Sequence, residues 1–144
     1  MEEMKDNVSA DIEKILTRYR TVAIVGASPN PERPSHRVAD FLKKEGFHVI
    51  PVTPNADKVV GEKAYPDLAS IPVPVEVVDI FRRAEDVPPI VQEAIAIGAK
   101  AVWMQEGIIN EEAAAKARKA GLTVVMDHCI RKELLRKLGR EKEI

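Results

Sequence analysis

Residues 21–31 read Thr-Val-Ala-Ile-Val-Gly-Ala-Ser-Pro-Asn-Pro, a short apolar run that ends in a Gly-Ala-Ser turn. An apolar run of this length is typical of a buried parallel strand. A turn that starts with glycine can direct backbone N–H groups toward a ligand, and the positive end of a following helix favours a phosphate. The stretch therefore predicts a strand, a nucleotide-binding turn and a helix, in that order.

Four further apolar runs follow this one along the chain. The predicted strands are residues 21–26, 48–52, 75–81, 101–104 and 123–126. Most of the stretches between them have helical periodicity, and this alternation is typical of a parallel sheet that is covered on both faces. The pattern predicts an α/β fold.

Capping residues and periodicity mark the helices. The predicted helices are residues 35–44, 85–97 and 111–120, with weaker amphipathic patterns at 9–17 and 130–138. Asn110 is a favourable N-cap for the third of them, and a glycine follows each of the first three. The proline-rich connection 53–74 has no clear periodicity, and we expect a long ordered loop with one helical turn near 67–69.

Length and charge restrict the classes of function. The 144 residues are 45% apolar, which suits one domain, and the net charge is −1 with both signs mixed along the chain. No basic face for nucleic acid and no apolar run long enough for a membrane span is evident, and we expect a cytoplasmic protein. Cys129 is the single cysteine and the three histidines lack metal-ligand spacing, so no metal site is predicted.

The Gly26-Ala27-Ser28 turn matches only the first glycine of the G-x-G-x-x-G dinucleotide fingerprint, because Ser28 and Pro31 replace the other two. The second strand also ends without an acidic residue in 51–55, where NAD-binding folds normally place a carboxylate for the ribose. The pattern therefore gives little support to NAD. A turn with no ligand remains an alternative at this point.

Two arginines, Arg82 and Arg83, follow the third predicted strand just before a helix. Cations at a helix N-terminus oppose its dipole, so the pair suggests a bound anion. The alternative is two solvated arginines that pair with Glu85 and Asp86. In an open α/β sheet, the loops at 26–28, 53–55, 81–83 and 105–107 would converge on one crevice at the carboxyl ends of the strands.

Seven segments together resemble the stand-alone coenzyme A-binding proteins, which are similar to the nucleotide-binding domain of the succinyl-CoA synthetase alpha subunit. The segments are residues 25–31, 33–38, 49–55, 61–65, 78–83, 103–107 and 125–129. The resemblance implies a three-layer, Rossmann-like, doubly wound parallel sheet of about five strands. It also implies a single domain over 1–144, with its core at about 15–138.

The resemblance further implies coenzyme A as the ligand, with its pyrophosphate over residues 26–28, its adenosine near 53–55 and 81–83, and its pantetheine arm toward 105–107. The expected binding residues are Gly26, Ala27, Ser28, Arg33, Ser35, His36, Arg37, Thr53, Pro54, Asn55, Phe81, Arg82, Arg83, Gln105 and Gly107. The serine hydroxyls and the arginines suit phosphates, and Phe81 suits the adenine.

Catalysis is not implied, because the synthetase uses a phosphorylated histidine on a second domain together with a partner subunit. We therefore expect a protein that binds coenzyme A or an acyl-CoA. One alternative is an enzyme that uses NAD(P) or an acyl-CoA and has its catalytic half on another chain, and another is an interaction module. We assign no catalytic residue: Asp79 is expected to form an internal hydrogen bond, and Cys129 to lie in the core or to face a ligand thiol.

Overall fold

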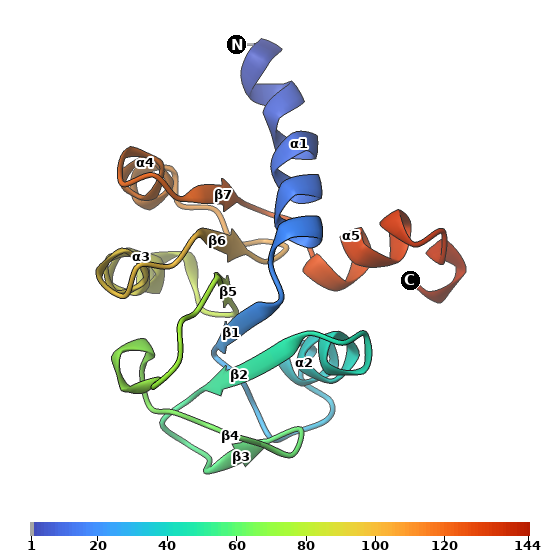
Figure 1. Ribbon diagram of the computed structural model, residues 1–144, viewed down its shortest axis with the longest axis vertical. Coiled ribbons are helices and arrows are strands. Elements are labelled where there is room, and N and C mark those ends of the chain that lie inside the picture. The colour runs from blue at the N-terminus through green and yellow to red at the C-terminus, as the bar shows by residue number, and fades with distance from the viewer. Residues whose placement is uncertain (1) are drawn as a thin grey trace.

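Five parallel strands form the central sheet of the computed structural model, which describes residues 2–144, with side chains from Val8 onward. The spatial order is β2-β1-β5-β6-β7 (Figure 1). The strands are β1 (Thr21–Val25), β2 (His48–Val52), β5 (Val77–Ile80), β6 (Ala101–Met104) and β7 (Thr123–Val125). Each lies inside a range predicted from the sequence, and the doubly wound parallel sheet is confirmed.

Helices cover both faces of the sheet, so the domain has three layers (Figure 1). One face carries α1 (Glu2–Arg18), α2 (Pro34–Lys44) and α5 (Ile130–Lys137), and the other carries α3 (Val87–Ala96) and α4 (Glu111–Lys119). Short 3₁₀ turns, η2 (Ala84–Asp86) and η3 (Glu141–Glu143), precede α3 and follow α5. Helix α1 is longer than the predicted 9–17 because it begins at Glu2.

The strands are buried on both faces, and alternate residues point to opposite layers. Ile24 and Trp103 pack toward α1, α2 and α5, whereas Val78 and Met104 pack toward α3 and α4. This arrangement explains why the strands read as continuous apolar runs in the sequence. Asp79 of β5 interrupts these runs, and it is fully buried between Ile24 and Trp103 on the neighbouring strands.

The chain reverses its direction of travel across the sheet at β1. From β1 it moves outward to β2, returns to the other side of β1 at β5, and then continues through β6 to β7. The loops after β1 and β5 therefore turn away in opposite directions, and an open α/β sheet offers a ligand crevice at this switch point.

Gly26, directly after β1, allows the two strand ends to approach closely. Its φ angle is +90°, and a Cβ atom placed on it would lie 2.5 Å from the carbonyl oxygen of Phe81 at the end of β5. Any side chain would collide with this backbone oxygen, which has no freedom to move aside. Glycine is therefore required here by the packing of backbone on backbone as well as by its own conformation.

The connection 53–74 is more structured than the expected loop. It contains a hairpin made of β3 (Lys58–Val59) and β4 (Glu62–Lys63), which the sequence analysis missed. The two turn residues, Val60 and Gly61, both have positive φ angles of 49° and 77°, as in type I′ hairpin turns. Asparagine or glycine is usual at the first of these positions, so a valine there concealed the turn. The expected helical turn is present as η1 (Leu68–Ser70).

We predict that Gly26→Ala lowers the free energy of unfolding by about 3 kcal/mol or more, because it combines a strained φ angle with a collision against the Phe81 carbonyl. Chemical denaturation measures this loss. Gly46→Ala is the matched control, since Gly46 has a φ of +94° but no other atom lies within 4 Å of the place that a Cβ would take. This variant should lose only about 1 kcal/mol of unfolding free energy. Equal losses in the two variants would contradict the backbone contact as the cause.

Candidate functional site

A cavity of about 710 Å³ opens at the carboxyl ends of the strands, at the switch point between β1 and β5. Its size is in the range of small-molecule and cofactor sites. Its walls come from the loops after β1, β2, β5 and β6, and from the starts of α2 and α5. The lining residues are Gly26, Ala27, Ser28, Pro29, Arg33, Pro34, Ser35, Val38, Thr53, Asn55, Phe81, Arg82, Arg83, Gln105, Glu106, Ile108 and Cys129.

Most residues predicted from the sequence as ligand contacts line this cavity. The exceptions are His36, Arg37, Pro54 and Gly107. His36 Nδ1 donates a hydrogen bond to the Ser28 carbonyl oxygen at 2.9 Å, and Arg37 Nη2 donates to the Glu32 carbonyl oxygen at 3.3 Å. Both side chains are thus directed at the backbone of the loop between β1 and α2, which they brace from outside the cavity.

The sequence analysis left several lining residues unassigned. These are Pro29, Pro34, Val38, Glu106 and Ile108. Helical spacing was the available signal for Val38, because it lies three residues after Ser35 and therefore shares its face of α2. The others neighbour predicted contacts, but they carry no chemistry that marks them as ligand-binding residues.

The turn after β1 offers fewer free N–H groups than its sequence suggests. The amide N–H groups of Gly26 and Ala27 both donate to the Val52 carbonyl oxygen, at 3.1 and 3.3 Å between nitrogen and oxygen. Among the described residues, the backbone amides of Ser28 and Ser35 have no hydrogen-bond acceptor. Donors for a ligand at this end of the cavity are therefore those of Ser28 and of the first turn of α2.

Helix α2 begins beside the cavity without a side-chain cap. Arg33 occupies the N-cap position and makes no capping hydrogen bond, Pro34 follows it, and the first turn holds no acidic residue. An uncapped helix N-terminus carries partial positive charge, which attracts anions. Because Ser35 and Arg33 both line the cavity there, this end of the site has the character of an anion-binding site.

Three arginines line the cavity, but their ion pairing differs. Arg83 pairs with Glu85 and Asp86, at 3.6 and 3.4 Å between Nε and the carboxylate oxygens. Neither Arg33 nor Arg82 forms an ion pair with any side chain that the structure describes. The alternative of an arginine paired with neighbouring carboxylates thus applies to Arg83, whereas Arg82 and Arg33 keep their charge available to a ligand.

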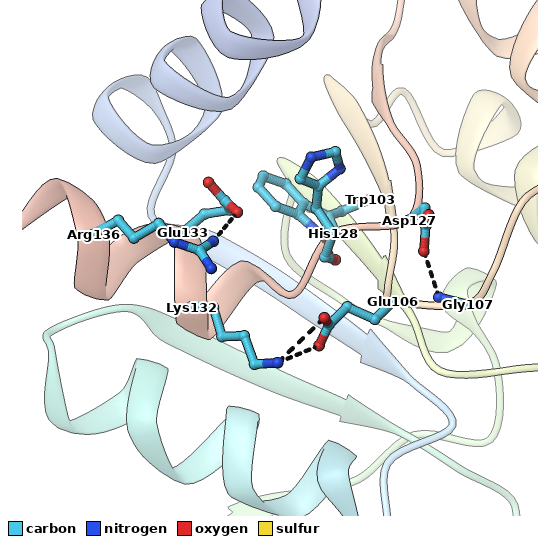
Figure 2. A network of polar contacts seen from close by, with 8 residues as sticks. All are labelled: Trp103, Glu106, Gly107, Asp127, His128, Lys132, Glu133 and Arg136. Carbon is cyan, nitrogen blue, oxygen red and sulfur yellow. Dashed lines mark hydrogen bonds and ion pairs between the residues drawn. The ribbon is translucent and has the colours of Figure 1, made fainter. Parts of the chain in front are cut away.

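Polar contacts hold the loop after β6 against the turn after β7 (Figure 2). Gly107 N donates to Asp127 Oδ1 at 2.7 Å, and Lys132 Nζ pairs with Glu106 Oε1 at 2.9 Å. Trp103 Nε1 donates to the His128 carbonyl oxygen at 2.8 Å. These bonds fix the backbone around Gln105, Glu106 and Cys129, which all line the cavity.

Comparison with known proteins identifies the family. A family model described as a CoA binding domain matches residues 20–134. The chain belongs to this CoA-binding domain family. It is similar to YneT of Bacillus subtilis (strain 168), with 38% identity over 89% of this chain and 95% of YneT.

Two further relatives place the domain among single-domain and multidomain proteins. The solved structure of a hypothetical protein from Pyrococcus horikoshii OT3 is 45% identical, with a TM-score of 0.87, and the match covers 90% of this chain and 92% of that one. The ADP-forming acetate–CoA ligase II of Archaeoglobus fulgidus is 34% identical over 78% of this chain, which corresponds to 17% of the ligase. The resemblance to the CoA-binding part of acyl-CoA synthetases is thereby confirmed.

Among the side chains that the structure describes, from Val8 onward, no cluster of three or more histidine, cysteine or acidic residues has the arrangement of a metal site. Over the same residues, none of the helices combines the length and the apolar character that crossing a bilayer requires.

Cys129 lines the cavity of the CoA-binding domain and is half-buried. Burial is the main cause that raises the pKa of its thiol, and the charge of Glu106 raises it further, as does that of Asp79 once Asp79 is ionised. The thiol is therefore protonated at neutral pH and is a weak nucleophile there. Cys129 was expected to lie in the core or to face a ligand thiol. The structure places its side chain at the cavity wall, packed against the core on the α1, α2 and α5 side of the sheet.

Asp79 lies beneath the cavity of the CoA-binding domain and does not line it. Its Oδ1 accepts a hydrogen bond from Gln105 Nε2 at 2.6 Å, so the expected internal bond is present. Its Oδ2 is the buried side-chain polar atom that lacks a partner among the described residues. Burial raises the pKa of Asp79 to about 8, and the bond to Gln105 only partly opposes this shift.

We predict that Asp79→Asn raises the stability of the CoA-binding domain at neutral pH and changes its pH dependence. The folded state keeps the Asp79 proton up to about pH 8, whereas the unfolded chain loses it near the ordinary aspartate pKa of 3.8. Between the ordinary pKa of an aspartate in the unfolded chain and about pH 8, Asp79 makes the free energy of unfolding fall with rising pH, by about 1.4 kcal/mol per pH unit. Asparagine keeps the contact with Gln105 and removes this slope.

Denaturation from about pH 5 to about pH 8 measures the slope. Asp57→Asn provides the matched control, because Asp57 is exposed and should leave the slope of the parent unchanged. Parallel curves for the parent and Asp79→Asn would show that Asp79 is ionised in the folded state.

Proposed function

We propose that this domain binds coenzyme A or an acyl-CoA in the cavity at the β1–β5 switch point. The observation that carries the proposal is the convergence of residues 26–28, 53, 55, 81–83 and 105 on one cavity, in a chain that belongs to the CoA-binding domain family. The ligand is a long molecule with phosphates at one part and a thiol or thioester at the other.

The start of α2 suits the pyrophosphate. The amide N–H groups of Ser28 and Ser35 and the charge of Arg33 are available there, and none of them is used by the protein among the described residues. An uncapped helix N-terminus adds a favourable dipole. The phosphate site rests on the helix start and Ser28 more than on the amides of Gly26 and Ala27, which are bonded to Val52.

Arg82 suits the 3′-phosphate that distinguishes coenzyme A from NAD. It lines the cavity, is exposed, and pairs with no described carboxylate. Thr53 and Asn55, at the end of β2, occupy the place where an NAD site normally has an acidic residue. The part of the lining formed by Gln105, Ile108 and Cys129 has the half-apolar character that a pantetheine arm and its thiol need.

A second candidate is participation in acyl-CoA chemistry whose catalytic residues lie on another chain. The observation that favours it is the match of this domain to 17% of an ADP-forming acetate–CoA ligase. Binding of an acyl-CoA is common to both candidates. Turnover assays with a partner protein would separate them.

We predict that coenzyme A raises the melting temperature more than NAD at equal concentration, because a ligand that binds only the native state stabilises it by mass action. A series of thermal unfolding curves at increasing ligand concentration measures this. Equal or larger shifts with NAD would overturn the assignment of coenzyme A.

We predict that Arg82→Ala weakens coenzyme A binding by about ten- to a hundredfold, as expected for the loss of one charge-assisted contact of about 1.5–3 kcal/mol. Calorimetric titration should find a much smaller effect on 3′-dephospho-coenzyme A. Arg83→Ala should have the weaker effect, since Arg83 is already paired with Glu85 and Asp86.

Arg118→Ala on α4 is the control for loss of a surface arginine, because Arg118 is exposed and does not line the cavity. An equal loss of affinity for the two ligands in Arg82→Ala would show that Arg82 does not recognise the 3′-phosphate.

A further inference from the structure

Asp79 and Gln105 form a buried polar pair at the carboxyl ends of β5 and β6, where Gln105 and Cys129 line the cavity. Asp79 is fully buried on the sheet face that α1, α2 and α5 cover, and Gln105 is 4% exposed. Gln105 nevertheless lines the cavity, and its side-chain amide is not completely enclosed by the protein. One end of this amide therefore meets Asp79, and the other end is open to the cavity.

The surroundings of Asp79 favour a neutral carboxylic acid. An ionised carboxylate would place a full charge on two oxygens, of which Oδ2 has no partner in the described structure. Among the side chains that the structure describes, Gln105 is the one that hydrogen-bonds Asp79, and no cation contributes to the Asp79 pKa. A buried charge without a counter-charge is strongly unfavourable, whereas a neutral acid is tolerated.

A neutral acid carries one O–H group, which needs an acceptor. If Gln105 Nε2 donated to Oδ1, the Asp79 proton would remain on Oδ2, buried and unpartnered. The two ends of a glutamine amide have the same shape, so the partner decides which one faces it. The separation of 2.6 Å between Oδ1 and the Gln105 amide is also more typical of an O–H···O bond than of an N–H···O bond.

We propose that Asp79 acts as a protonated positioning residue that donates its O–H to Gln105 Oε1 and so turns the Gln105 NH₂ group into the cavity. There the NH₂ donates a hydrogen bond to a carbonyl oxygen of the ligand. This proposal rests on the proposed function, because coenzyme A supplies an amide carbonyl and an acyl-CoA supplies a thioester carbonyl at that end. Ionised Asp79 can only accept, and it would turn Oε1 toward the ligand carbonyl instead.

The titratable groups around this pair are few. The turn before α5 brings Cys129 and His128, the cavity rim brings Glu106 with its partner Lys132, and α2 brings His36. His36 and His128 use Nδ1 on backbone carbonyl oxygens of Ser28 and Met126. The neighbouring strands β1 and β6 place the apolar side chain of Ile24 and the indole of Trp103 beside Asp79.

The test measures the affinity for acetyl-CoA, which has no titrating thiol, from about pH 7 to about pH 9, because burial raises the Asp79 pKa to about 8. The parent should lose about five- to tenfold in affinity over this range, the loss expected when one hydrogen bond is removed. Asp79→Asn cannot titrate and should show no such loss. Adenosine 3′,5′-bisphosphate lacks the pantetheine arm, and its affinity should stay constant in the parent.

A second measurement needs no ligand. In the ¹³C NMR spectrum of the parent, the Asp79 side-chain carboxyl should titrate near pH 8, and the ¹⁵N shift of the Gln105 side-chain amide should change with it. A carboxyl that titrates near its usual pH would overturn the proposal. So would an acetyl-CoA affinity whose pH dependence is the same in the parent and in Asp79→Asn.

The outcomes also separate this proposal from the proposed function. If acetyl-CoA and coenzyme A fail to bind at any pH, the proposed function falls, and the ligand contact of Gln105 falls with it. If both ligands bind tightly with no dependence on Asp79, only the positioning role is wrong.

Discussion

The close approach of two strand ends, where the Gly26 backbone meets the Phe81 carbonyl, is the constraint on which the rest of the site depends. This contact lies where the chain reverses its direction across the sheet. Because β1 and β5 end side by side, their loops must leave in opposite directions, one toward α2 and the other toward η2. The cavity is the space that this divergence leaves open.

The walls of the cavity are held mainly by bonds that lie outside it. His36 donates to the carbonyl oxygen of Ser28. Asp127 accepts from the amide of Gly107, and Trp103 donates to the carbonyl oxygen of His128 (Figure 2). Such bonds fix loop backbones before any ligand arrives, and preorganised donors lose less freedom on binding. Groups next to a predicted binding loop can thus serve the loop itself, as the His36 side chain and the Gly107 amide do.

The sheet and most helices could be predicted because buried parallel strands require continuous apolar runs, and because glycine and asparagine mark helix ends by their own conformations. The β3–β4 hairpin could not, since Val60 holds a positive φ angle that its side chain disfavours. The bond between Asp79 and Gln105 joins residues 26 positions apart, and only the register of β5 and β6 brings them together. Local patterns contain no signal for such a pair.

The segment after β2 has a consequence for association between molecules. Strand β2 is an outer strand of the sheet, and exposed outer strands can recruit strands from other chains and aggregate. Here Tyr65 accepts from Thr53 N at 2.8 Å and donates to the Pro51 carbonyl oxygen at 3.0 Å, while Pro51 itself has no N–H to offer. The segment after β2, which supplies Thr53 and Asn55 to the cavity wall, therefore also covers the outer edge of β2 near its carboxyl end and takes up hydrogen-bonding groups that a strand from another molecule would need there.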